Sequence, residues 1–318
     1  MAVFPLRLVP PDTKIDFIGR RKAAFVFSAL LVALSLVFFA VKGLNYGIDF
    51  KGGILMEVRT PGAADIDALR KRLSGLGLGE VALQEFGQPT DVLIRIERQP
   101  GGEKGQLVAV EKVKEALGKD VASYRRTEFV GPKVGGELIQ AGILAVVLSL
   151  LAIMVYVWFR FEWQFSIGAI VALTHDVVAT IGLFSVLGLE FNLATVAAIL
   201  TIAGYSINDT VVVFDRIREN LRKFKTMQIE ALLNLSLNQT LSRTLLTSVT
   251  TLLALLAIYI FGGAVIRDFG FALIWGVLVG TYSSIFVASP VVMMLKIRES
   301  ITSGSVGGGE TGQENPAE

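Results

Sequence analysis

The chain lacks cysteine and is very poor in histidine. None of its 318 residues is cysteine, and His175 is its single histidine. Disulfides, thiolate nucleophiles, Cys-based metal sites and His-rich metal sites are therefore excluded. We expect no metal, no bound cofactor and no catalytic centre.

Charged residues are also scarce. They make up 18% of the chain, while hydrophobic residues make up 53% and the mean hydropathy is +0.60. Soluble proteins carry about 25% charged residues. The composition indicates a polytopic α-helical protein embedded in a lipid bilayer. The small net charge of +2 gives no sign of a nucleic-acid partner.

Six apolar runs have the length that a membrane-spanning helix needs. They are 23–41, 138–159, 165–189, 193–214, 244–266 and 269–295. The first run follows the polar segment 1–22 and could belong to a cleaved signal peptide. It is too long for a typical signal peptide, and no clear small-residue cleavage site follows it, so we predict an uncleaved span. The other five runs form a predicted bundle over 138–295, and the Gly-rich tail 300–318 is expected to be disordered.

Lysine and arginine in the short loops give the expected orientation. With both termini cytoplasmic, nearly all these basic residues lie inside, and the short loops outside hold only Arg267. In the predicted cytoplasmic loop 215–242, Ile217, Leu221 and Phe224 share one helical face among basic residues. This pattern favours either a helix lying on the membrane surface or a simple orientation signal.

Residues 44–133 form a separate water-soluble segment on the opposite side. Strand and helix patterns alternate in the order β-α-β-β-α-β, with strands near 54–59, 81–86, 91–97 and 121–130 and helices near 63–74 and 103–117. This order is typical of a ferredoxin-like domain. That fold hosts many functions and therefore indicates none.

The most unusual residue is Asp209, an acid inside the fourth apolar run. A charge in hydrocarbon is costly and normally faces a partner or a water path. Three polar neighbours, Ser206, Asn208 and Thr210, favour a polar path. Arg243 and Thr247 begin the next span at a similar depth, so Asp209 and Arg243 could pair. The pair could respond to protons, or it could be a static ion pair that joins two helices.

The third run contains His175 and Asp176 near its middle. Adjacent helical residues point about 100° apart, so the two need not line one path. We expect Asp176 to face the bundle. His175 is either a proton relay or a neutral, hydrogen-bonded imidazole.

Five motifs distributed along the chain resemble one known family. They are GIDFKGG at 47–53, FVGPKVGGEL at 129–138, THDV at 174–177, SINDTVVVFDRIREN at 206–220 and SRT at 242–244. Together they closely resemble the SecD/SecF family of protein-export membrane proteins in the RND superfamily. The motif residues outside the spans are Gly47, Asp49, Phe50, Gly52, Gly53, Gly131, Pro132, Gly135 and Glu137.

The resemblance implies a non-enzymatic subunit of the bacterial inner (cytoplasmic) membrane, with 44–133 in the periplasm. It implies a SecD partner, the SecYEG channel and, in many members, YajC. The implied function is to use the proton motive force, with protons as the coupling ion, to move unfolded preproteins across the membrane and release them. The family's functional acid and arginine map onto Asp209 and Arg243, and its third-span acid maps onto Asp176.

Three other functions share part of this pattern. A non-energised scaffold for SecD or the channel would not need Asp209 to titrate. An RND-like small-molecule exporter would need a larger external pocket than 44–133 offers. An intramembrane hydrolase would use Asp176 and Asp209, but their expected depths differ and no motif for that chemistry is present.

Overall fold

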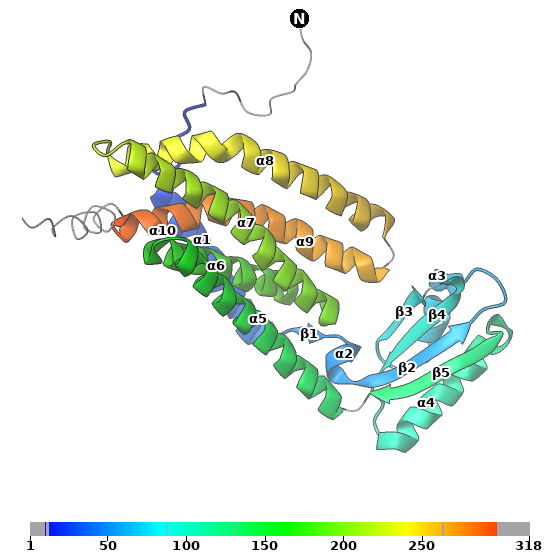
Figure 1. Ribbon diagram of the computed structural model, residues 1–318. Coiled ribbons are helices and arrows are strands. Elements are labelled where there is room, and N and C mark those ends of the chain that lie inside the picture. The colour runs from blue at the N-terminus through cyan, green and yellow to red at the C-terminus, as the bar shows by residue number, and fades with distance from the viewer. Residues whose placement is uncertain (1–9, 11–12, 87, 131, 263, 298–318) are drawn as a thin grey trace, which may run out of the picture.

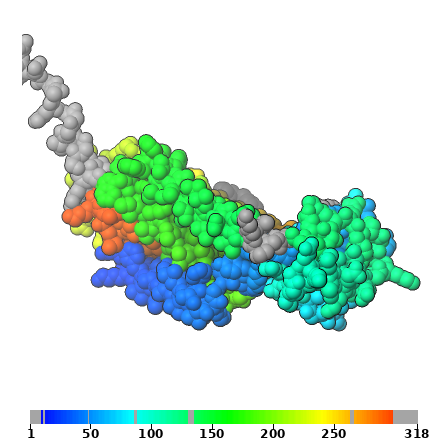
Figure 2. Space-filling view, turned by 90° about the horizontal axis from the view of Figure 1, so that it is seen from below, coloured from blue at the N-terminus to red at the C-terminus, as the bar shows by residue number. Residues whose placement is uncertain are grey.

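The computed structural model describes residues 10, 13–86, 88–130, 132–262 and 264–297. A helical bundle carries a small domain, here called the sheet domain, at one end (Figure 1). In the space-filling view the sheet domain is a lobe at the end of an elongated molecule (Figure 2). Gly131, the predicted disordered tail 300–318 and most of the segment before Thr13 lie outside the described residues.

Six helices within the described residues are long and apolar enough to cross a membrane. They are α1 (Arg21–Lys42), α5 (Pro132–Arg160), α6 (Trp163–Leu187), α7 (Leu193–Lys223), α8 (Ile229–Phe261) and α9 (Ala264–Ser283), the last continuing through the π-helical segment Ser284–Ala288 into α10 (Ser289–Met294). The prediction of a polytopic α-helical membrane protein is therefore confirmed.

The helices differ in how much of their surface the protein itself covers. About half or more of the most apolar window is buried in α6 (56%), α7 (50%) and the α9–α10 helix (61%). The corresponding fractions are 17% for α8, 11% for α1 and 6% for α5. The first three helices thus form the centre of the bundle, and the other three expose most of their apolar surface.

The segment 215–242, predicted to be a partly helical loop, is helical except at 224–228. The structure has helix up to Lys223 and again from Ile229, so α7 and α8 both extend past the predicted spans 193–214 and 244–266. The apolar face expected on the membrane surface packs inside the protein instead. Ile217 and Leu221 are buried in one core cluster with Leu232 and Leu233 of α8. Hydropathy identifies only the apolar part of a helix, so it does not predict how far the helix continues into a polar environment.

The segment before α1 is fixed to α8 at the end opposite the sheet domain. The backbone N–H groups of Ile15 and Phe17 donate to the side-chain oxygens of Asn238 and Asn234, each at 2.9 Å. The N-terminal end of α1 and the α7–α8 turn therefore lie at the same end of the bundle (Figure 1).

The sheet domain has the element order that the sequence predicts. It comprises β2 (Gly53–Arg59), α3 (Ile66–Ser74), β3 (Val81–Phe86), β4 (Gln88–Glu97), α4 (Gly102–Leu117), a 3-10 turn (Gly118–Asp120) and β5 (Ser123–Val130). Its antiparallel sheet has the strand order β3-β4-β2-β5. Alternate residues of β2, namely Ile54, Met56 and Val58, are buried with Leu73 of α3 and Val113 of α4.

Short elements join the sheet domain to the bundle. Strand β1 (Asn45–Tyr46) pairs in parallel with β6 (Glu190–Phe191), which precedes α7. The one-turn helix α2 (Ile48–Lys51) follows β1 and packs against α5. We call β1, α2, β6 and the first turns of α5 and α7 the junction.

Candidate functional site

Asp176 is completely buried between three central helices. Its Oδ2 atom accepts hydrogen bonds from the hydroxyls of Ser206 on α7, at 2.6 Å, and Ser283 on α9, at 2.8 Å. Its Oδ1 atom lies 3.0 Å from Nδ1 of His175. The Asp176 carboxyl group is therefore well satisfied inside the protein.

The serines that reach this site come from a break in the last helix. The π-helical segment Ser284–Ala288 follows Ser283 directly, and Pro290 lies one turn beyond. A π-helical turn widens the helix and changes the direction of the side chains that follow. Ser283 and Ser284 are both fully buried, and the Ser284 hydroxyl lies 2.8 Å from that of Thr210. Neither serine is among the residues predicted from the sequence, although SSIFVASP in an apolar run was the available signal.

Asp209 lies on α7 three residues after Ser206, about 4.5 Å further along the axis. Its side chain is buried, and its Oδ1 atom accepts a long hydrogen bond of 3.4 Å from the Thr247 hydroxyl on α8. That hydroxyl also lies 2.9 Å from the backbone oxygen of Thr244. The Oδ2 atom of Asp209 has no hydrogen-bond partner within the described part of the chain. Asp209 is thus much less satisfied than Asp176.

Two residues predicted beside Asp209 are exposed and form no hydrogen bond or ion pair with its side chain among the described residues. Arg243 is exposed on α8 and makes no ion pair with Asp209 among the described residues. Asn208 is exposed on α7, so it does not line the interior polar path. The predicted path does include Ser206 and Thr210, whose hydroxyl donates to the backbone oxygen of Ser206 at 3.0 Å. Equal depth does not determine which way a side chain points around a helix.

His175 lies beside Asp176 and not on a separate path. Its Nδ1 atom lies 3.0 Å from Oδ1 of the Asp176 carboxyl group. Its Nε2 atom is buried and has no hydrogen-bond partner in the described residues. The ring centroid lies 6.1 Å from that of Tyr282, whose hydroxyl donates to the backbone oxygen of Ala24 at 2.9 Å.

The motif glycines lie at the junction and allow close backbone approach. A Cβ at Gly135 would overlap the carbonyl oxygen of Phe50, and one at Gly47 would overlap the side chain of Glu190. Gly52 has a φ of +75°, which side chains disfavour, and Gly53 is buried at the start of β2. These residues build the connection between bundle and sheet domain. Pro132 begins α5 and Glu137 is exposed on it.

Asp49 connects the sheet domain to the helix that carries Asp209. Its Oδ2 atom accepts the backbone N–H of Leu193, the first residue of α7, at 3.2 Å. Its Oδ1 atom accepts from the Arg95 guanidinium of β4 at 3.3 Å. A carboxylate at a helix N-terminus is favoured by the helix dipole. The role of Arg95 and the α7 N-terminus could not be read from the motif.

Comparison with known proteins identifies the family. The family model described as protein export membrane protein SecD/SecF, C-terminal, matches residues 109–298, more than half of the chain. The chain belongs to the SecD/SecF family. A second model, the SecD/SecF GG motif, matches residues 37–60, which include β1, α2 and the glycines Gly47, Gly52 and Gly53.

Individual relatives in the SecD/SecF family cover nearly the whole chain. Protein translocase subunit SecF of Rickettsia rickettsii is 47% identical, covering 94% of this chain and 97% of that protein. The subunit of Rickettsia bellii is 46% identical, covering 92% and 97%.

Two solved structures of SecDF also superpose on this chain. The crystal structure of SecDF from Thermus thermophilus, a translocon-associated membrane protein, has a TM-score of 0.73 and 38% identity. The alignment covers 92% of this chain and 40% of the SecDF chain. SecDF in a super-membrane-facing form has a TM-score of 0.74 at 38% identity, covering 95% and 41%. This SecD/SecF family member thus spans about two fifths of the SecDF chain.

Proposed function

We propose that this chain is the SecF subunit of a bacterial protein translocase and that it couples proton movement to preprotein export together with a SecD partner. The observation that carries the proposal is Asp209, a buried carboxyl group with one unpartnered oxygen in the middle of a membrane-spanning helix. A buried polar atom without a partner is costly. Binding a proton, or a hydrogen-bonding partner that arrives during the transport cycle, would remove this cost and stabilise the carboxyl group.

Hydroxyl groups extend from the neighbourhood of Asp209 toward the second acid. Thr210 follows Asp209 directly and lies beside Ser284, while Ser206 donates to Asp176. We infer that these hydroxyls, with water, exchange protons between Asp209 and Asp176. Arg243 then serves as a charge that forms a direct ion pair with Asp209 in another state of the cycle.

Movement of α7 would reach the sheet domain through Asp49. The helix runs without a break from Leu193, held by Asp49, to Asp209 and beyond. One proton crossing about 150 mV supplies about 3.5 kcal/mol. That energy can shift a two-state equilibrium by about two to three orders of magnitude.

The surface of α7 and α8 supports a partner chain. Three polar or charged side chains are exposed on these helices within the membrane-spanning region, namely Thr201, Asn208 and Arg243, and Gly204 is exposed among them. Polar and charged side chains facing lipid are costly. We infer that a SecD subunit covers this face. The alignment with this chain covers only 40% of the SecDF chain of known structure. We infer that the rest of the SecDF chain contains what a separate SecD would supply.

We propose the bacterial inner membrane as the location, with both termini in the cytoplasm and the sheet domain in the periplasm. Basic side chains gather at the α7–α8 end of the bundle, which the positive-inside rule assigns to the cytoplasm. They include Arg160, Arg216, Arg218, Arg222, Lys223 and Lys225. The SecYEG channel, YajC and unfolded preprotein remain the proposed further partners.

Preprotein translocation into proton-energised vesicles tests the proposal. The full chain carrying Asp209→Asn is produced with SecD and compared with Asp215→Asn. Asp215 lies on the same helix but is exposed and paired with Arg160 at 3.0 Å. We expect Asp209→Asn to assemble and to lose the proton-dependent stimulation, while Asp215→Asn retains it. If Asp209→Asn keeps the stimulation, Asp209 is structural here, and Asp176 or the partner chain must carry the coupling.

A further inference from the structure

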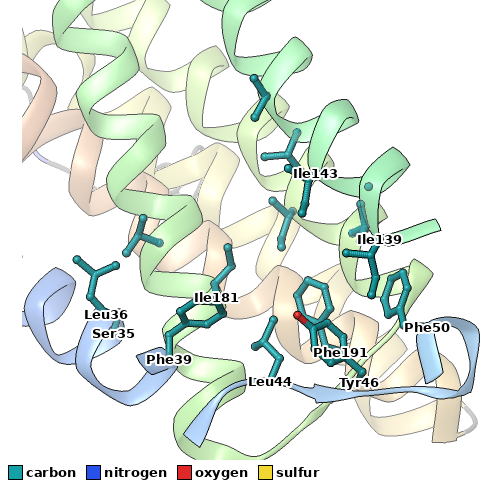
Figure 3. A pocket seen from close by; sticks show the side chains of 16 residues that line it. Ser35, Leu36, Phe39, Leu44, Tyr46, Phe50, Ile139, Ile143, Ile181 and Phe191 are labelled. Carbon is teal, nitrogen blue, oxygen red and sulfur yellow. The ribbon is translucent and has the colours of Figure 1, made fainter. Parts of the chain in front are cut away.

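An apolar cavity of about 300 Å³ lies between α1, α5 and α6, on the side of β1 that faces the bundle (Figure 3). Leu36, Ile143 and Ile181 are among its walls, and Ser35 and Tyr46 supply the only polar side chains among its described lining residues. An apolar cavity of about 150 Å³ stays dry and can hold benzene. This cavity is about twice that size, so it suits hydrocarbon better than water.

The cavity opens sideways between two outer helices of the bundle. Phe39 of α1 and Val147 of α5 line it yet remain 43% and 47% exposed, and Leu36 and Ile143 are more than half exposed. α1 and α5 are also the two helices with the smallest buried fractions. The medium at this mouth is therefore the membrane interior, whose hydrocarbon chains are the available occupants.

Positive charge lies beside the end of the cavity nearest the sheet domain. Lys42 is the last residue of α1, three residues after the lining residue Phe39, and Lys51 follows the lining residue Phe50. Both ammonium groups donate to neutral acceptors. Lys42 donates to the backbone carbonyl of Val186 at 3.0 Å, and Lys51 donates to the side-chain oxygen of Asn45 at 3.4 Å. Neither forms an ion pair within the described ranges. Lysines of this kind beside apolar surface attract phosphate groups at a membrane.

We propose that the cavity binds one acyl chain of a phospholipid, with the lipid phosphate held by Lys42 and Lys51. The floor of the cavity is formed by Tyr46, Phe50 and Phe191 of the junction (Figure 3). Phe50 stacks on Phe191 with a centroid distance of 6.0 Å. A bound chain supplies contacts that these rings otherwise lack on one side. The lipid is thus a structural ligand of the junction, and this site is independent of Asp209.

A photoreactive lipid tests the site. The full chain, with and without SecD, is placed in phosphatidylethanolamine vesicles containing phosphatidylglycerol with a diazirine on one acyl chain, and the labelled peptides are mapped. We expect labelling to concentrate on the cavity walls of α1 and α5. Gly142 lines the cavity, and a Cβ there would meet Val196 only at ordinary distances of 3.5 Å and 3.7 Å. Gly142→Leu should therefore fill the cavity and abolish the concentrated labelling.

Gly136→Leu is the matched control, because a Cβ at Gly136 has nothing within 4 Å and the residue does not line the cavity. It should label like the parent chain. Replacing Lys42 and Lys51 with Gln should reduce labelling, whereas the same change at the exposed Lys104 and Lys112 should not. Labelling spread evenly over exposed helix faces, or unchanged by Gly142→Leu, overturns the proposal. Labelling that disappears when SecD is present also overturns it, because a partner helix would then be the occupant.

Discussion

Replacing Gly135 with alanine is expected to separate α5 from α2 at the junction. The new Cβ would overlap the carbonyl oxygen of Phe50 and lie 2.8 Å from its carbonyl carbon. Both are backbone atoms that cannot rotate away, so one segment must move. Overpacking of this kind costs about 1–3 kcal/mol. Gly136→Ala adds the same methyl group one residue later, where nothing lies within 4 Å. Both variants gain helix propensity, so the difference between them isolates the overpacking cost.

Hydrogen exchange of the detergent-solubilised full chain measures this difference. Amides of residues 48–51 and 135–140 should exchange about 5- to 150-fold faster in Gly135→Ala than in Gly136→Ala, since each 1.4 kcal/mol is tenfold. Exchange in β2 to β5 should change little, because the sheet domain has its own core. Equal exchange in the two variants would refute the close packing of α2 on α5.

Three further perturbations follow from the site and the sheet domain. Ser283→Ala should lower the unfolding free energy by about 0.5–1.5 kcal/mol, because it removes a hydrogen bond to the buried Asp176 carboxyl group; equal thermal stability of Ser283→Ala and Ser289→Ala, whose hydroxyl bonds only its own helix, would argue against this hydrogen bond. Asp49→Ala should destabilise the first turn of α7 by about 1 kcal/mol, as loss of a helix cap does, and so speed amide exchange there about fivefold. Unchanged exchange would mean that the hydrogen bond from the Leu193 N–H to Asp49 is not formed. A hydrogen bond from Arg59 lowers the pKa of Asp91 below its usual 3.8, so the stabilisation is present above pH 3.8 and is lost as the pH falls through the lowered value. The ratio of pepsin cleavage rates, Asp91→Asn over the parent chain, should therefore be larger at pH 5, where only the parent has this stabilisation, than at pH 2, where the parent has lost most of it. A pH-independent ratio would contradict this.

The spans and the sheet-domain order could be predicted because their signals are local. Apolar runs identify helices that face lipid, and the alternation of Ile54, Met56 and Val58 identifies a half-buried strand. The length of α7 and α8 could not be predicted from hydropathy, because Ile217 and Leu221 continue the core inside a polar stretch.

The polar site depends on side-chain directions that spacing does not determine. Ser283 ends α9 and Ser284 begins the π-helical segment, and both side chains are fully buried. His175 contacts Asp176 directly, with 3.0 Å between Nδ1 and Oδ1, although residues adjacent on a helix start about 100° apart. Arg243 has the expected depth but lies on the surface.

The central claim is that the protonation of Asp209 moves the sheet domain. The chain has no cysteine, so paired spin labels can be introduced directly at the exposed residues Glu111 of α4 and Leu187 of α6. Their distance distribution is measured by pulsed electron paramagnetic resonance, with SecD present, in vesicles with and without a proton gradient. We predict a shift on energisation that Asp209→Asn abolishes and Asp215→Asn retains. An identical shift in Asp209→Asn, or no shift in the parent chain, would contradict the claim.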